Sequence, residues 1–245
     1  MRAIDIFMHS IMLVRRNPGA AIRLSLPYLT MTVLVDATLK LNFLSYESAR
    51  NSTINGIAIV LLLIACAWVA VAWHRYVLRE EMPSALLPTF SRNLVLGYLG
   101  RSILLGLAII VPLMALSIFM KLLVPQSVVN HPIEGSIVVE IFVWLPVSWL
   151  FYRWSLILPA WALHNRMSFR ESWKHTSDVA GMIFVLCVIF AGVQIVLDQV
   201  TLLLSEAGIV VASIADMVLQ WLCFMIAVSV LTTLYGHLVE NRDLN

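Results

Sequence analysis

Two aspartates and two glutamines lie in the last two apolar segments, at positions that match in depth if those segments form a helical hairpin. The turn of that hairpin falls near 206–208, and Asp198 and Asp216 are each nine residues from its centre. Gln194 and Gln220 are each thirteen residues from the same point. Because residues four apart share a helix face, the sequence predicts one layer of carboxylates and one of amides.

Two carboxylates held that close together cannot both stay ionised unless a cation lies between them. Such a pair is therefore typical of a proton or cation site. The alternative is that each aspartate pairs separately, for instance with Lys40 or Lys121, or opens toward headgroup water. Acids within a membrane need only face the bundle interior to be tolerated, which favours this second interpretation.

Two further acids in apolar segments have a basic residue within reach. Lys121 and Glu140 are equidistant from a turn around 130–132, and Asp36 and Lys40 are four residues apart on one helix. An ionised side chain at the centre of a membrane helix costs about 2.5–3.5 kcal/mol on insertion scales. The sequence therefore predicts two structural ion pairs that neutralise these charges.

The elements that must position these side chains follow from the composition. Of the 245 residues, 61% are apolar and 12% are charged, with a mean hydropathy of +0.91. A soluble domain has about 45–50% apolar and about 25% charged residues, so a bilayer is the expected solvent. The predicted spans lie near 20–43, 56–76, 95–123, 135–160, 179–204 and 209–238.

The basic residues are divided unequally between the two sides of these spans. Thirteen of the sixteen lysines and arginines lie at the termini or near the loops after the second and fourth spans. The other side carries only Lys40, Arg50 and Lys121. Because short cytoplasmic loops are enriched in basic residues, the sequence predicts a multi-pass protein with both termini in the cytoplasm.

A pattern of landmarks recurs along the chain. Phe7, Phe90 and Phe169, spaced 83 and 79 residues apart, each begin a short amphipathic stretch before an odd-numbered span. The even-numbered spans end in aromatic and basic residues at spacings of 79 and 83. The prediction is a single all-α domain over 1–245, a six-span bundle with three interfacial amphipathic helices and a threefold repeat of hairpins. The repeat units are about 1–78, 84–158 and 163–240.

On the basic side, several arginines lie beside aromatic residues at the level expected for lipid headgroups. Guanidinium groups in such positions suit the phosphates of anionic lipids. The positive-inside rule with its aromatic belt explains the same pattern without a specific lipid site and is favoured. The candidate headgroup contacts are Arg75, Arg101, Arg153, Arg170, Trp154 and Trp173.

No motif in the sequence indicates a soluble catalytic, metal-binding or nucleic-acid-binding function. It contains no Walker loop, HExxH, GxSxG or dinucleotide fingerprint. The three cysteines lie in apolar segments without CxxC spacing, and the six histidines lack the spacing of metal ligands. We therefore expect no cofactor, no metal and no nucleic-acid partner.

Two stretches carry a family resemblance. Residues 153–160, Arg-Trp-Ser-Leu-Ile-Leu-Pro-Ala, and residues 167–176, Met-Ser-Phe-Arg-Glu-Ser-Trp-Lys-His-Thr, together with the opening Asp5-Ile6-Phe7 and Ser10, resemble the YciC-like family of six-span bacterial inner-membrane proteins. That family is related to the membrane domain attached to some glycerophosphodiesterases. The resemblance implies a bacterial inner-membrane location and supplies no catalytic residues. The sequence contains no phosphodiesterase domain, so that activity is not expected.

Three functions remain as hypotheses. The favoured one is a non-enzymatic accessory or organising subunit that contacts lipids or another integral membrane protein. The second is a small transporter or a proton- or cation-coupled channel that uses Asp198 and Asp216. A water-filled cavity reaching these residues would favour this second hypothesis, and burial in dry contacts would count against it. The third is a membrane enzyme acting on lipid phosphate, which lacks an evident nucleophile or metal triad.

Overall fold

The computed structural model describes residues 2–44, 48–82, 86–206 and 208–243, and within these ranges its only regular secondary structure is helical, without strands. Its elements are α1 (Ala3–Arg16), α2 (Pro18–Leu44), α3 (Ser48–Arg79), α4 (Arg92–Leu123), α5 (Gln126–Val129), α6 (Pro132–Val139), the π-helical segment η1 (Glu140–Trp144), α7 (Leu145–Trp154), α8 (Ile157–Ala162), α9 (Phe169–His175), α10 (Ala180–Ser205) and α11 (Ile209–Leu238).

Six segments of the described chain are long and apolar enough to cross a membrane. They are Pro18–Thr38, Ile54–Arg79, Arg92–Leu123, Ile137–Ala162, Ala180–Leu204 and Val211–Leu238. Each overlaps one of the six predicted spans, so the prediction of an all-α polytopic membrane protein is confirmed.

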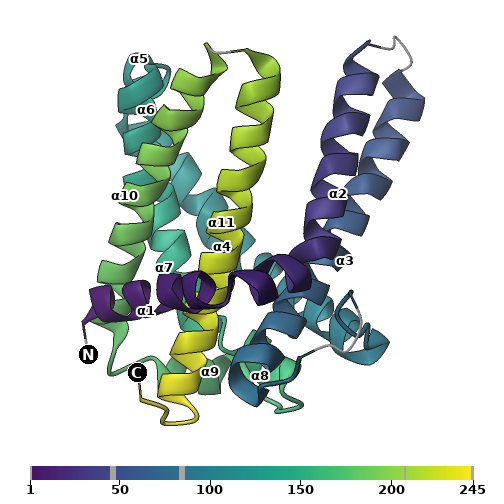
Figure 1. Ribbon diagram of the computed structural model, residues 1–245. Coiled ribbons are helices and arrows are strands. Elements are labelled where there is room, and N and C mark those ends of the chain that lie inside the picture. Colours follow the sequence, from purple (N-terminus) through teal and green to yellow (C-terminus); the bar gives the residue numbers. More distant parts are fainter. Residues whose placement is uncertain (1, 45–47, 83–85, 207, 244–245) are drawn as a thin grey trace.

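The bundle is closed at one end and open at the other. Figure 1 shows both termini at the closed end, hereafter the terminal end, where α1 lies across the spans and α8 and α9 cover them. Toward the opposite end, the α2–α3 hairpin diverges from the α10–α11 hairpin (Figure 1). The accessible surface is 13878 Å². A compact soluble monomer of this mass exposes about 11,000 Å², so a large apolar surface is left for lipid or ligand.

Packing at the terminal end is held by polar contacts between buried side chains. Trp73 and His74 of α3 are fully buried. The Trp73 indole donates to Ser229 Oγ at 2.9 Å, and His74 Nδ1 lies 2.8 Å from Thr232 Oγ1. The buried Ser10 of α1 donates to Thr233 Oγ1 at 3.3 Å. These bonds join α1 and α3 to α11, so the three elements form one rigid unit.

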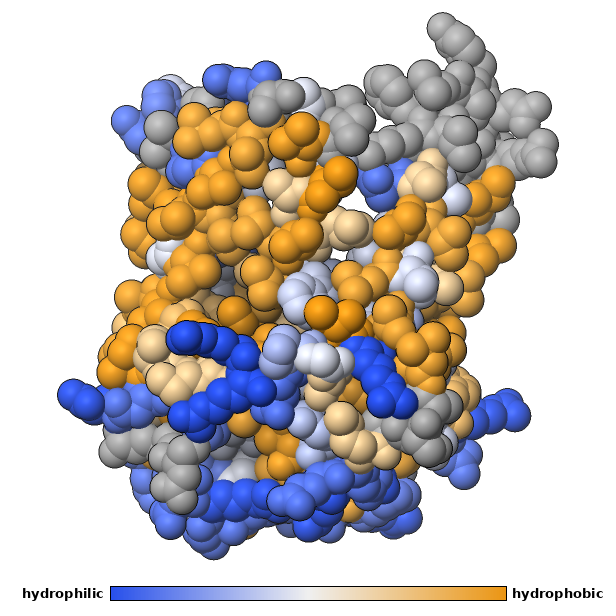
Figure 2. All heavy atoms as spheres, in the orientation of Figure 1, coloured by the Kyte–Doolittle hydropathy of each residue, from blue (hydrophilic) through white to orange (hydrophobic). Residues whose placement is uncertain are grey.

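The surface reflects the same division. Figure 2 shows hydrophobic residues over the middle and upper part of the bundle and hydrophilic residues gathered at the terminal end. Exposed apolar side chains such as Val111, Leu122 and Leu203 belong to the helices of the upper part. An exposed apolar band of this kind is the surface that a bilayer solvates.

The fourth span is a broken helix. The backbone N–H of Leu145 donates to the carbonyl of Glu140, five residues back, so η1 has a π-helical turn. Pro146 follows directly and has no N–H to donate, which interrupts the regular hydrogen-bond ladder of the helix. A second break at 155–156 separates α7 from α8. Single π-turns inside membrane helices occur frequently at functional sites.

Helices are present at the first and third of the three predicted interfacial segments, and the prediction of a helix at the second is wrong. α1 and α9 are helices, but the described residues between α3 and α4 form none. Pro88 lies in this stretch, and Phe90 packs edge-on against Trp68 with ring centroids 5.0 Å apart. The amphipathic pattern that begins at Phe90 instead continues into the first turn of α4.

α9 is short, and its start is fixed by a capping box. Ser168 Oγ accepts the backbone N–H of Glu171, and the Glu171 carboxylate accepts the backbone N–H and hydroxyl of Ser168. These hydrogen bonds to the charged form hold the pKa of Glu171 below its ordinary value. The cap is therefore complete at neutral pH and is lost as the pH falls through that lowered pKa.

Candidate functional site

The α10–α11 hairpin places the predicted polar layers. α10 ends at Ser205 and α11 begins at Ile209, so the turn lies where the sequence places it. Gly208 has a φ of 112°, a left-handed conformation that a residue with a Cβ adopts only at a cost, which explains a glycine here. The two helices leave this turn antiparallel, with their polar residues at matched distances from it.

All four predicted polar residues line one small cavity between α10 and α11. Its volume is about 180 Å³, and Asp198, Asp216, Gln194 and Gln220 all form part of its wall. Gln194 Nε2 donates to Asp198 Oδ1 at 2.9 Å. That bond runs along α10, so the aspartate and glutamine of this helix are linked to each other. In the described part of the chain, Asp216 makes no hydrogen bond and no ion pair.

A larger groove of about 550 Å³ adjoins this cavity and separates α2 from the last hairpin. On α2 it is lined by Tyr28, Thr32 and Asp36, which are four residues apart and so share one face. Asp216 and Gln220 line both the groove and the small cavity. The two hollows therefore meet at these side chains. Figure 2 shows the surface hollowed between the two hairpins in this upper region.

The site has an excess of negative charge. Glu140, in the π-turn of the fourth span, lies close enough to Asp198 to interact with it electrostatically. No lysine or arginine among the described side chains forms an ion pair with Asp198, Asp216 or Glu140. In a medium of low dielectric constant, carboxylates in such an arrangement require protons or an external cation.

The predicted Lys121–Glu140 ion pair is absent. The loop contains α5, which moves the centre of the turn toward the N-terminal side of residues 130–132. Lys121 lies two residues before the end of α4, whereas Glu140 lies eight residues after the start of α6. At 1.5 Å per residue, Glu140 is roughly 9 Å deeper in the bundle. The predicted pair of Asp36 with Lys40 falls outside the described side chains, because that of Lys40 is not among them.

The arginines at the terminal end bind mainly to the protein itself. Arg75 donates to both carboxylate oxygens of Glu81 at 2.8 Å and to the carbonyl of Ala162 at 3.0 Å. The Arg101 guanidinium lies 3.5 Å from the centre of the Trp161 ring. Of the four arginines predicted to contact headgroups, only Arg170 is exposed and makes no hydrogen bond or ion pair in the described part of the chain. Five of the six predicted lipid contacts are thus engaged in packing within the protein: Arg75, Arg101, Arg153, Trp154 and Trp173.

Arg153 is the most buried of these arginines, at 4% exposure. Its Nε donates to Thr176 Oγ1 at 2.8 Å, and a second nitrogen donates to the carbonyl of Trp173 at 3.1 Å. Its guanidinium also lies 3.8 Å from the centre of the Trp173 ring. Arg153 therefore fastens α9 and the entry to α10 onto α7.

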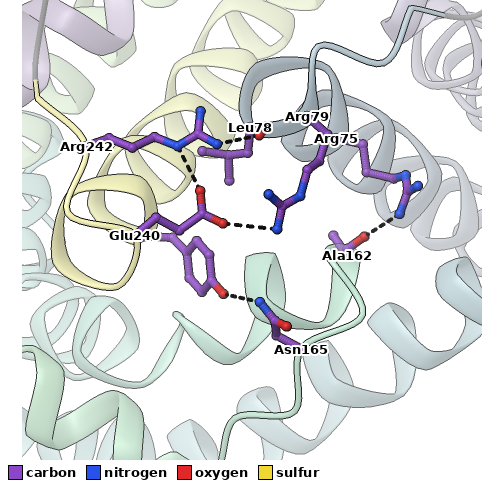
Figure 3. Close-up of polar contacts among 8 residues, drawn as sticks. Arg75, Leu78, Arg79, Ala162, Asn165, Glu240 and Arg242 are labelled. Carbon is purple, nitrogen blue, oxygen red and sulfur yellow. Dashed lines mark hydrogen bonds and ion pairs between the residues drawn. The ribbon is translucent and has the colours of Figure 1, made fainter.

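Figure 3 shows how the segment after α11, with Glu240 and Arg242, is held against the rest of the terminal end. Glu240 accepts from Arg79 at 3.3 Å and from Arg242 at 2.8 Å, and Arg242 also donates to the carbonyl of Leu78. The amide of Asn165 donates to Tyr235 Oη at 3.0 Å. These contacts close the terminal end with the protein's own charges, in contrast to the opposite end.

No protein-family model, curated protein or solved structure matches this chain. The assignment of the site therefore depends on its geometry. Among the described residues, no group of three His, Cys, Asp or Glu side chains is arranged to hold a metal ion. The chemistry available in the groove is that of carboxylates, amides and hydroxyls.

Sequence reasoning missed the wall of the site that α2 contributes. The sequence predicts a local pair of Asp36 with Lys40 and offers Asp36 only as a further member of a transport site with Glu140, and it does not single out Tyr28 or Thr32. Their spacing of four residues, ending in an acid within an apolar segment, was a signal that could have identified a polar face. Nothing in the sequence placed that face opposite Asp216, because the position of one hairpin relative to another is set by long-range packing.

Proposed function

We propose that the chain is a small, non-enzymatic transport protein that binds a cation or a cationic group in the groove between α2 and α11. One observation carries this proposal. Asp198, Asp216, Gln194 and Gln220 line one cavity, which opens into a groove that also contains Asp36. A hollow that brings these residues together is the feature that favours transport over structural neutralisation of separate acids.

The chemistry follows from the charge of the groove. Asp198 and Asp216 form no ion pair with a lysine or arginine among the described side chains. Carboxylates of this kind attract cations and release them or exchange them for protons when the surroundings change. The π-turn at Glu140 adds a break in a spanning helix beside Asp198, and broken helices are common at the binding sites of transporters. The groove supplies binding, and its opening at one end supplies access.

The orientation belongs to the same proposal. The terminal end carries most of the basic residues, so it faces the cytoplasm of a bacterial inner membrane by the positive-inside rule. The groove then opens toward the outer side of the membrane. The YciC-like relationship and the threefold repeat stay predictions, and neither is needed for the assignment of the groove.

Uptake of a small cation into proteoliposomes tests this function. We expect saturable uptake of labelled tetramethylammonium by the wild type, and a loss of at least about tenfold in the double variant Asp198→Asn, Asp216→Asn. Glu134→Gln is the matched control, because Glu134 is exposed and lies outside the groove. Uptake no greater than in protein-free liposomes, or equal uptake by the double variant, would refute the transport assignment.

A second candidate function is supported by the shape of the groove. Its walls on α2 and α11 each extend over nine residues, from Tyr28 to Asp36 and from Ala212 to Gln220, or about 12 Å. Thr32, Ala212 and Ser213 are small residues of the kind that allow helices to approach closely. An accessory subunit would place a partner's transmembrane helix here, with a lysine or arginine facing Asp216. Native purification distinguishes the two functions, since only this one requires a stoichiometric membrane partner.

A further inference from the structure

A third hollow, the apolar cavity, lies deeper in the bundle, on the side of the groove that faces the terminal end. Its volume is about 290 Å³, and residues of α3, α4, α7, α8 and α11 form its wall. The wall is almost wholly apolar, with Cys66, Phe151, Leu158 and Phe224 among its members. A dry cavity of about 150 Å³ is enough to bind benzene, so this one has room for a sizeable apolar group.

Two stacked aromatic rings separate this cavity from the groove. Tyr28 lines the groove, Phe224 lines the cavity, and their ring centroids lie 4.7 Å apart at an interplanar angle of 15°. The pair therefore forms a thin partition between an acidic hollow and an apolar one.

The cavity ends toward the terminal end at a hydrogen-bonded pair. Tyr98 forms part of its wall, and the Tyr98 hydroxyl lies 3.2 Å from His74 Nε2. Both side chains are buried, at 5% and 0% exposure. Since His74 also binds Thr232, this network joins α3, α4 and α11 behind the cavity. An apolar group that enters from the groove therefore meets a closed end.

We infer that the groove and the apolar cavity are two halves of one site for an amphiphile with a cationic head and a single apolar chain. This inference rests on the proposed function and names the class of its ligand. The head lies at Asp216, and the chain passes the Tyr28–Phe224 pair into the cavity. Asp216 and Phe224 are eight residues apart on α11, so the chain extends about 12 Å from the head.

Three properties of the site match this ligand. The carboxylates of the groove neutralise the head. Tyr28 lines the groove beside Asp216, so its ring can attract a quaternary ammonium group held there by a cation–π interaction. The polar groove lies toward the end of the bundle away from the termini, and the apolar cavity lies toward mid-membrane. A lipid-like molecule in one leaflet has its polar head and apolar chain in the same order. A small inorganic cation would use only the groove.

The test compares tetramethylammonium with hexyl-, decyl- and tetradecyltrimethylammonium, which share a head and differ in chain length. Binding is measured by equilibrium dialysis to the full chain in phosphatidylcholine nanodiscs, after subtraction of binding to empty nanodiscs. We expect the decyl compound to bind at least about tenfold more tightly than tetramethylammonium, since each methylene that enters the apolar cavity is removed from water. The gain should level off for the tetradecyl compound once the cavity is filled.

Variants assign the gain to the cavity. Ala227→Leu fills it from α11 and should remove most of the decyl advantage while leaving tetramethylammonium binding unchanged. Cys66→Leu fills it from the opposite wall and gives an independent check if the first variant folds poorly. Ala115→Leu, on an exposed face of α4, is the control and should bind like the wild type.

The outcomes separate this inference from the proposed function. Equal affinity for all chain lengths, with tetramethylammonium still bound, would overturn the two-part site and leave the cation site in place. A decyl advantage that survives both cavity-filling variants would also overturn it. Absence of binding for every compound would refute both proposals.

Discussion

The variant Asp216→Asn is expected to lose cation binding and to become more stable at the same time. Asp216 lies in a membrane span and lines both the groove and the small cavity between α10 and α11. It has no hydrogen bond or ion pair in the described part of the chain. Removing such a charge lowers the cost of placing α11 in the bilayer, by up to about 2.5 kcal/mol. The asparagine keeps the shape of the side chain but cannot attract a cation.

Two measurements on the same preparation check this prediction. Thermal unfolding in nanodiscs should give a higher midpoint for Asp216→Asn than for the wild type, and tetramethylammonium should raise the midpoint of the wild type only. Glu134→Gln should change neither quantity, because Glu134 is exposed outside the groove. A lower midpoint together with unchanged ligand stabilisation would mean that Asp216 is a structural residue.

Of the variants described here, Arg153→Gln is expected to cause the largest loss of unfolding free energy. Arg153 is buried, donates to Thr176 Oγ1 and the Trp173 carbonyl, and stacks on the Trp173 ring. A glutamine removes the charge-assisted hydrogen bonds and the stack together, and it leaves buried acceptors without donors. We expect a loss of about 2–4 kcal/mol in unfolding free energy.

Arg170→Gln is the matched control for this change. Arg170 is an arginine of α9 itself, but it is exposed and makes no hydrogen bond or ion pair in the described part of the chain. The substitution should alter stability by less than about 0.5 kcal/mol. Hydrogen exchange adds a local measurement, since α9 should exchange faster in Arg153→Gln than in Arg170→Gln. Equal stability of the two variants would contradict the anchoring role of Arg153.

Composition and local spacing were sufficient to predict the spans and the last hairpin. Long apolar segments have one solution in a bilayer, so the six helices follow from hydropathy alone. The turn at 206–208 is short, and residues equidistant from a short turn share a depth. For that reason, the gathering of Asp198, Asp216, Gln194 and Gln220 in one cavity agrees with a sequence-based expectation.

The same reasoning failed where the connection between two spans is longer. Between α4 and α6 the short helix α5 shifts the centre of the turn, so Lys121 and Glu140 lie at different depths. Before α4, a proline and the Trp68–Phe90 contact replace the predicted interfacial helix. The groove itself depends on how the α2–α3 hairpin packs against the remaining spans. Such packing depends on contacts between segments far apart in the chain, which local periodicity does not encode.

Cys223 offers the most direct test that the groove and the small cavity it adjoins form an accessible, cation-selective site. Its thiol lines the small cavity with Asp198 and Asp216, so it reports the local potential when Cys66 and Cys187 are replaced by alanine. Labelling rates are measured with a cationic and an anionic methanethiosulfonate, each relative to its rate with a free thiol. The cationic reagent should react at least about tenfold faster, and Asp198→Asn with Asp216→Asn should abolish that preference. Equal rates for both reagents, or a preference unchanged in the double variant, would contradict a cation-binding groove.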